Sequence, residues 1–157
     1  MTDSLRRRLG LALAILTGLF VLRVLGQALV AFISVRFLPP MEQWYSGLVP
    51  YAALLPIQIA MIAVMIKLVA DVVRGAGYFS RANRGVGRFL KWFSYVYFAS
   101  MLARYAITMT VYPERRWLSG TIPIWFHMVL AAFVFVYGTY HVRWTLEPRA
   151  KASPHAS

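Results

Sequence analysis

The chain has 157 residues, of which 60% are hydrophobic and only 14% are charged. Soluble domains contain about 45–50% apolar and about 25% charged residues, so a soluble fold of this size could not bury so much apolar surface. We therefore expect a single membrane domain, partly solvated by lipid. The chain has no cysteine, which excludes disulfides, thiolate metal sites and cysteine nucleophiles. The net charge of +12 comes from basic residues at the edges of apolar runs, which favours the bilayer over nucleic acid as a partner.

Four apolar runs follow one another, and each can form a helix that crosses about 30 Å of hydrocarbon. Helix is expected because lipid offers the backbone no hydrogen-bond partners. The runs predict an all-α polytopic membrane protein, a four-transmembrane-helix bundle over residues 1–146, with spans at about 9–38, 48–73, 89–112 and 122–142. Pro56 predicts a kink in the second span, and the first span is too long for a cleaved signal peptide. The polar residues 147–157 are expected to form a disordered cytoplasmic tail.

The basic residues predict which way the helices point. Loops that carry an excess of Lys and Arg stay on the cytoplasmic side. The outer side of the predicted topology receives only Arg36, Arg115 and Arg116. The inner side receives twelve basic residues: Arg6, Arg7, Arg8, Lys67, Arg74, Arg81, Arg84, Arg88, Lys91, Arg143, Arg149 and Lys151. We therefore expect an inner-membrane protein with both termini in the cytoplasm.

Several polar residues fall at membrane depth, between the midplane and the outer face of the predicted spans. A charged side chain there costs about 2.5–3.5 kcal/mol even on the mildest scale, so it normally faces protein, water or a partner. Helical spacing places Gln27 one turn from Arg23, and it places Tyr97 and Arg104 on one stripe of the third span. These residues predict a ligand-binding pocket in the outer half of the bundle, formed by Arg23, Gln27, Gln58, Tyr97, Arg104 and His127.

No acidic residue lies deep in any predicted span, which leaves the two buried arginines without an obvious counter-charge. Arg23 and Arg104 could snorkel or cap neighbouring carbonyls, or they could pair with an acid on a partner subunit. Glu42 or Glu114 could also dip inward from the outer loops. The remaining alternative is an outward-facing cavity in which both arginines bind an anionic, lipid or quinone-like headgroup.

The first run also carries small residues at helical spacing. Gly10, Ala14 and Gly18 form a groove suited to close helix packing, nearly opposite Arg23 on a helical wheel. A helix within a four-helix unit has one inward side. The second packing side therefore predicts self-association, or docking to another membrane protein, although small residues are common in membrane helices in any case.

His127 and His141 lie fourteen residues apart on the fourth run, so they share a helix face about 21 Å apart, with the small residues Ala131 and Gly138 between them. This spacing resembles the two-haem helices of the cytochrome b family, in which paired histidines ligate stacked haems. That family uses a second helix with matching histidines, whereas the only further histidine here is His155. The resemblance implies b-type haem electron transfer only if two copies of the chain pair their fourth helices.

Enzyme chemistry has little support, because no carboxylate pair, Ser-His-acid set or His-rich metal motif is present. The leading interpretation is a small, non-enzymatic accessory or binding subunit of the cytoplasmic membrane, with no resident cofactor. The rival interpretation is the haem protein.

Overall fold

The computed structural model describes residues 3–33, 38, 44, 50–111 and 122–151. These residues are all-α, and they form no strand. The long helices are α1 (Asp3–Ile33), α3 (Tyr51–Arg74), α4 (Arg84–Val111) and α5 (Ile122–Lys151), and a short 3-10 helix, η1 (Tyr78–Ser80), lies between α3 and α4.

The helix ends follow from the turn residues around them. Pro50, with extended backbone, precedes the first turn of α3, where its missing N–H is no loss. Gly75 ends α3 in the left-handed conformation (φ 68°), which glycine adopts without strain. The Asn83 side chain accepts hydrogen bonds from the backbone N–H groups of Gly85 and Val86, at 2.8 and 3.2 Å, and so caps the start of α4.

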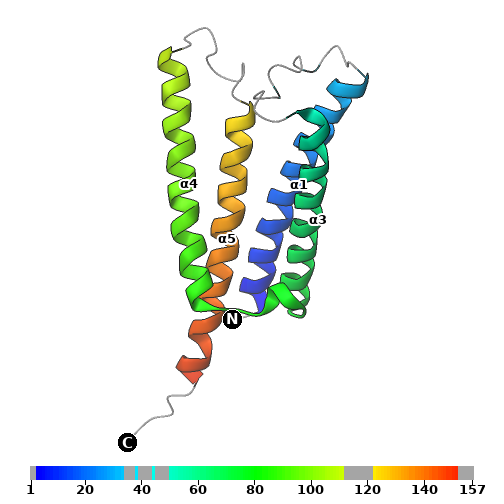
Figure 1. The fold of residues 1–157 in the computed structure, drawn as a ribbon. Helices are drawn as coiled ribbons and strands as arrows, with labels where there is room; N and C mark the ends of the chain where they lie inside the picture. The colour runs from blue at the N-terminus through cyan, green and yellow to red at the C-terminus, as the bar shows by residue number, and fades with distance from the viewer. Residues whose placement is uncertain (1–2, 34–37, 39–43, 45–49, 112–121, 152–157) are drawn as a thin grey trace, which may run out of the picture.

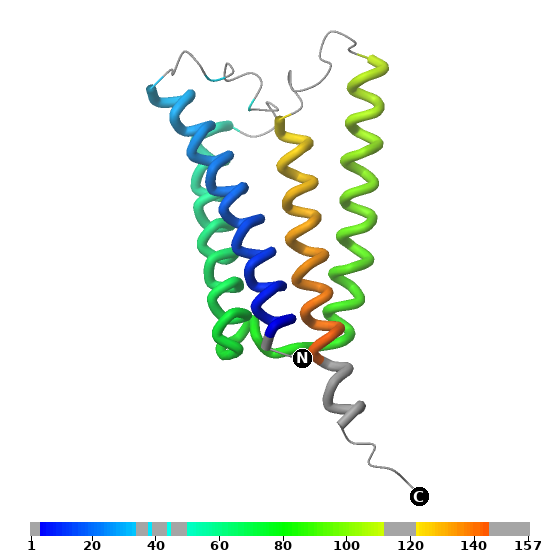
Figure 2. Tube along the Cα trace, turned by 180° about the vertical axis from the view of Figure 1, so that it is seen from behind, coloured from blue at the N-terminus to red at the C-terminus, as the bar shows by residue number. Residues whose placement is uncertain are grey.

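The four long helices stand side by side in the order α4, α5, α1, α3 (Figures 1 and 2). Among the described residues, α5 contacts α4 and α1, and α1 contacts α3, but α3 makes no close backbone contact with α4 or α5. The arrangement is therefore an open row with α1 and α5 inside it. Because α1 has a neighbour from the same chain on each of two sides, burial on two sides does not require a second subunit.

The predicted spans agree with three of the helices. In the described part of the chain, α1, α3 and α5 are long and apolar enough to cross a membrane. The predicted third span corresponds to α4, which starts five residues earlier than expected and is less apolar. The helix α3 continues through Pro56. The helix α5 extends to Lys151, into the predicted tail, and residues 152–157 lie outside the described residues, so the disorder of the tail stays a prediction.

The helices α4 and α5 meet closely at a pair of glycines. A Cβ added to Gly87 would lie 2.7 Å from the Cβ of His141 and 2.9 Å from the carbonyl oxygen of Gly138. A Cβ on Gly138 would in turn lie 3.1 Å from the carbonyl oxygen of Gly87. Small residues let membrane helices approach to backbone contact, where dispersion forces hold them together. The glycine pair therefore fixes the crossing of α4 and α5.

The loop between α3 and α4 is bound to the end of the row that also holds the start of α1 (Figure 1). The Asp71 carboxylate, buried near the end of α3, pairs with Lys67 and accepts a hydrogen bond from the Phe79 N–H at 3.2 Å. From α5, the Tyr137 and Tyr140 hydroxyls donate to the carbonyls of Phe79 and Ser80, each at 2.9 Å. These bonds connect α3 to α5 through the loop, although the two helices make no close backbone contact within the described residues.

The described basic residues at the helix ends gather at this same end of the row, which we call the basic end. It holds the start of α1, the end of α3, the connecting loop and the start of α4 (Figure 1). The three basic residues predicted for the opposite side, Arg36, Arg115 and Arg116, lie outside the described residues.

Gly87→Ala should lower the thermal stability of the detergent-solubilised protein, because the added methyl group would meet backbone atoms of α5. Overpacking of this kind costs about 1–3 kcal/mol. Gly18→Ala is the matched control: a Cβ there meets nothing within 4 Å, and alanine has the higher helix propensity. Equal melting temperatures for the two variants would contradict the close α4–α5 crossing.

Candidate functional site: a polar cavity between three helices

A small enclosed cavity lies in the half of the row away from the basic end. Its volume is about 120 Å³. The backbones of α3 and α5 are not in close contact, and the cavity lies between these two helices, with α1 as its third wall. Its lining includes Phe20 and Arg23 from α1, Gln58 from α3, Phe126 and His127 from α5, and Trp44 from the segment between α1 and α3.

Arg23 is the charged residue of this cavity, and it is only 9% exposed. Its guanidinium donates one hydrogen bond, to the carbonyl of Trp44 at 3.3 Å, and its Cζ lies 5.7 Å from the centre of the Phe126 ring. A guanidinium has five N–H donors, and Nε here is buried and makes no hydrogen bond within the described residues. The charge is therefore incompletely satisfied by the described residues.

Two glutamines at the same depth are joined across the α1–α3 contact. Gln58 Nε2 donates to Gln27 Oε1 at 3.2 Å, and the two residues are 3% and 0% exposed. Their other polar atoms, Gln27 Nε2 and Gln58 Oε1, are buried and make no hydrogen bond with any described residue. The pair therefore has one amide nitrogen and one amide oxygen without a partner among the described residues. Of the two residues, Gln58 lines the cavity.

His127 connects the cavity to α4. Its Nδ1 shares a hydrogen bond of 2.7 Å with the hydroxyl of Tyr97, which belongs to α4, on the other side of α5 from the cavity. Tyr97 itself does not line the cavity. Its role is to fix the orientation of the imidazole that does, while Arg23, Gln58 and His127 supply the polar part of the wall.

The structure does not bring Arg104 into the lining of this cavity. Its side chain is exposed on α4, whereas Arg23 lines the cavity from α1. The reason lies in the order of the helices. Since α4 contacts only α5 among the described long helices, most of its polar stripe faces outward. The Thr108 hydroxyl on that stripe bonds its own helix, at the Arg104 carbonyl.

Trp44 belongs to the site although the sequence analysis did not predict it there. The residue is 8% exposed, and its ring lies against α1 at Gly26, where a Cβ would come within 2.8 Å of Cη2. A glycine one residue before Gln27 was the available signal, since glycine in a helix often permits the close approach of another group. Trp44 both closes the cavity and accepts the bond from Arg23.

The two histidines of the haem alternative have other partners. His127 bonds Tyr97, and His141 Nδ1 accepts a hydrogen bond from the Asn83 N–H at 2.9 Å. The helix face between the two histidines, which carries small residues, is covered by α4, and Ala131 on this face is only 1% exposed. No group of three His, Asp or Glu side chains suited to a metal occurs among the described residues. This geometry gives the haem alternative no support.

The small-residue stripe of α1 faces α3 of the same chain. A Cβ on Gly10 would lie 2.6 Å from Cγ2 of Val73, so the two helices touch there. Ala14 and Gly18 line an open groove that continues from this contact. Self-association through the stripe stays a prediction.

Comparison of the chain with protein-family models, with curated proteins and with solved structures finds no match.

Gln27→Leu should destabilise the protein, because it leaves the buried Gln58 amide without its partner, at a cost of about 1–3 kcal/mol. The double variant, with Gln58→Leu added, should recover part of the lost stability, because neither buried amide of the pair is then present without its partner. Unfolding of the two single variants and the double variant gives a coupling energy, which averages about 0.6 kcal/mol for membrane proteins. A coupling of zero would contradict the Gln27–Gln58 bond.

Proposed function

We propose that the chain is a non-enzymatic binding or accessory subunit that crosses the cytoplasmic membrane four times. Its ligand is a small headgroup that carries hydrogen-bond-accepting oxygens, either anionic or quinone-like, on a lipid or another apolar molecule. The observation that carries the proposal is Arg23: a guanidinium at membrane depth, buried, with one hydrogen bond to a carbonyl and an Nε that has no partner among the described residues.

The free-energy cost of burying the Arg23 charge favours the presence of a bound ligand. Burying a cation in a membrane is unfavourable unless a counter-charge or strong dipole accompanies it. Asp71, the buried acid of α3, lies thirteen residues further along the helix than Gln58 and is engaged by Lys67. Glu42 and Glu114 lie outside the described residues. A bound oxygen acceptor would supply the interaction that the described side chains do not.

The size and polarity of the cavity restrict the ligand. An apolar cavity of about 150 Å³ holds one benzene molecule, so a volume of about 120 Å³ suits a single ring or one compact anion. Arg23 offers an N–H donor and Gln58 an acceptor oxygen, while Phe20 and Phe126 provide apolar walls. A few placed polar groups in an otherwise apolar pocket are typical of ligand sites.

The membrane topology is supported by charge and by exposed surface. The twelve-to-three bias of basic residues favours the basic end as the cytoplasmic side, with both termini there. The helix α4, which corresponds to the predicted third span, has 28 residues, or about 42 Å of helix. Large apolar and aromatic side chains on its outer surface, among them Phe89, Trp92 and Ile107, are more than half exposed, which suits lipid or a partner subunit.

Arg23→Gln should weaken binding of the headgroup by roughly tenfold or more, since hydrogen bonds to charged groups contribute about 1.5–3 kcal/mol. The probes are an alkyl phosphate and a benzoquinone with the same short alkyl chain. Binding is followed through the fluorescence of Trp44, which lines the cavity, with Trp44→Phe to identify its contribution.

Arg104→Gln is the matched control, because it removes the same charge from an exposed site on α4. It should leave the affinity for both probes unchanged. Equal losses in the two arginine variants, or no loss in Arg23→Gln, would contradict a ligand site at Arg23.

The proposed topology can be tested with single cysteines, because the chain has none of its own. An impermeant thiol reagent applied to whole cells should label Ser119→Cys, on the predicted outer side, and spare Ser153→Cys in the tail. Both positions lie outside the described residues. Labelling of Ser153→Cys alone would reverse the orientation, and labelling of both would contradict the even number of spans.

A further inference from the structure

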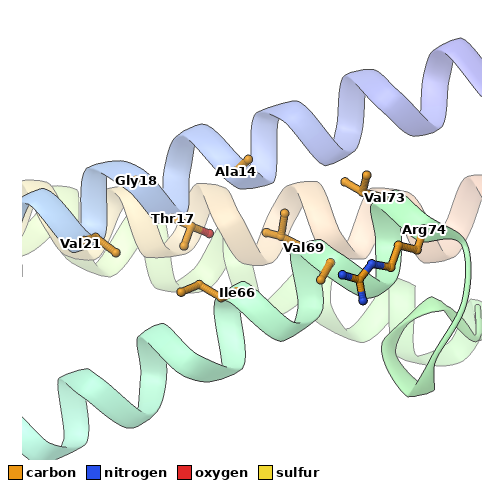
Figure 3. Close-up of a pocket in the computed structure, with 9 residues that line it drawn as sticks. Ala14, Thr17, Gly18, Val21, Ile66, Val69, Val73 and Arg74 are labelled. Atoms are coloured by element: carbon orange, nitrogen blue, oxygen red, sulfur yellow. The ribbon is translucent and has the colours of Figure 1, made fainter.

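A second hollow lies between α1 and α3, nearer the basic end and separate from the Arg23 cavity (Figure 3). Its volume is about 560 Å³, and it is open to the surroundings of the protein. Ala14 and Gly18 form its floor on α1, while Ile66, Val69 and Val73 line it on α3. We call this feature the α1–α3 groove.

One charged residue, Arg74, lines the groove, and it lies at one end. Arg74, the last residue of α3, folds its side chain back so that the guanidinium lies beside the groove (Figure 3). The side chain is exposed and makes no ion pair or hydrogen bond within the described part of the chain. The groove thus combines an apolar channel with a single cation at its mouth.

We propose that the α1–α3 groove binds one anionic phospholipid, with an acyl chain between the helices and the phosphate on Arg74. The site is distinct from the Arg23 cavity, and the proposal does not depend on the function proposed for that cavity. A lipid of the leaflet next to the basic end has the matching polarity, because its phosphate lies at the surface and its chains run toward the midplane.

The dimensions fit an acyl chain. The lining residues of α3 extend from Ile66 to Arg74, which is about 12 Å of helix. One leaflet provides about half of the 30 Å hydrocarbon thickness, so the groove follows most of the depth of a lipid chain. Toward the basic end α1 and α3 approach each other at Gly10 and Val73, and Arg74 lies at this end of the groove.

Charge distinguishes this lipid from a second copy of the chain. The chain carries a net charge of +12, and Arg7, Arg8, Arg74 and Arg81 are all exposed at the basic end. A second copy docked in parallel would bring like charges together there, whereas an anionic headgroup brings the opposite charge. Basic residues beside a membrane attract anionic lipid by about 1 kcal/mol each, or roughly fivefold in affinity.

The experiment uses the full chain, exchanged in detergent against phosphatidylglycerol and phosphatidylcholine with identical acyl chains. Native mass spectrometry then counts the retained lipids. The wild-type protein should retain one phosphatidylglycerol in preference to phosphatidylcholine. Arg74→Gln should reduce this preference about fivefold, while Arg81→Gln, an exposed arginine at the same end but outside the groove lining, should leave it unchanged.

A second variant tests the groove itself. Gly18→Leu places a side chain in the open space above the helix and should abolish retention of both lipids. Unchanged preference in Arg74→Gln would overturn the proposal, and so would an equal loss in Arg81→Gln. If the wild-type protein retains no lipid and Gly18→Leu instead converts a dimer into a monomer, the groove holds a second copy and the lipid proposal is wrong. Should Gly18→Leu fail to fold, the two arginine variants decide.

Discussion

Hydrocarbon offers no hydrogen bonds, so every polar group at membrane depth must find its partner in the protein or in a ligand. This constraint organises the interior of the molecule. Hydroxyls such as those of Thr17 and Thr139 bond carbonyls of their own helices, and Gln27 bonds Gln58 across two helices. Arg23 is the group for which the described residues provide too little, and the cavity lies beside it.

The open row explains why there is a cavity at all. In a closed bundle α3 would pack against α5 and fill the space beside Arg23. Here α3 makes no close backbone contact with α5, and the loop at the basic end connects them, where Tyr137 and Tyr140 bind the backbone of Phe79 and Ser80. The two helices are thus held together at one end and separated at the other, and α1, with Trp44 above it, encloses the gap.

Much of the fold could be predicted from the sequence, because apolar run length and turn residues are local signals. Pro50 and Gly75, residue types that commonly flank helices, mark the two ends of α3. The site was predicted less well, since it depends on which helix lies beside which. The residues Arg23, Gln58 and His127 come together because they lie on α1, α3 and α5, whereas Arg104 lies on α4, which among the described long helices contacts only α5. Helix order is decided by packing, such as the Gly87–Gly138 contact, and the 3.6-residue period does not encode it.

Because Arg104 does not line the cavity, the cavity favours a different ligand from the one that two arginines would bind. Two arginines in one cavity would have called for a dianion or a bridging group. A single guanidinium needs one negative charge, and in a medium of low dielectric constant the attraction between opposite charges is large. A neutral quinone would satisfy N–H donors but leave the charge uncompensated, at the penalty that burial of a lone cation carries. Of the two proposed headgroups, the monoanionic one therefore fits Arg23 better, and the comparison of alkyl phosphate with alkyl benzoquinone measures that difference directly.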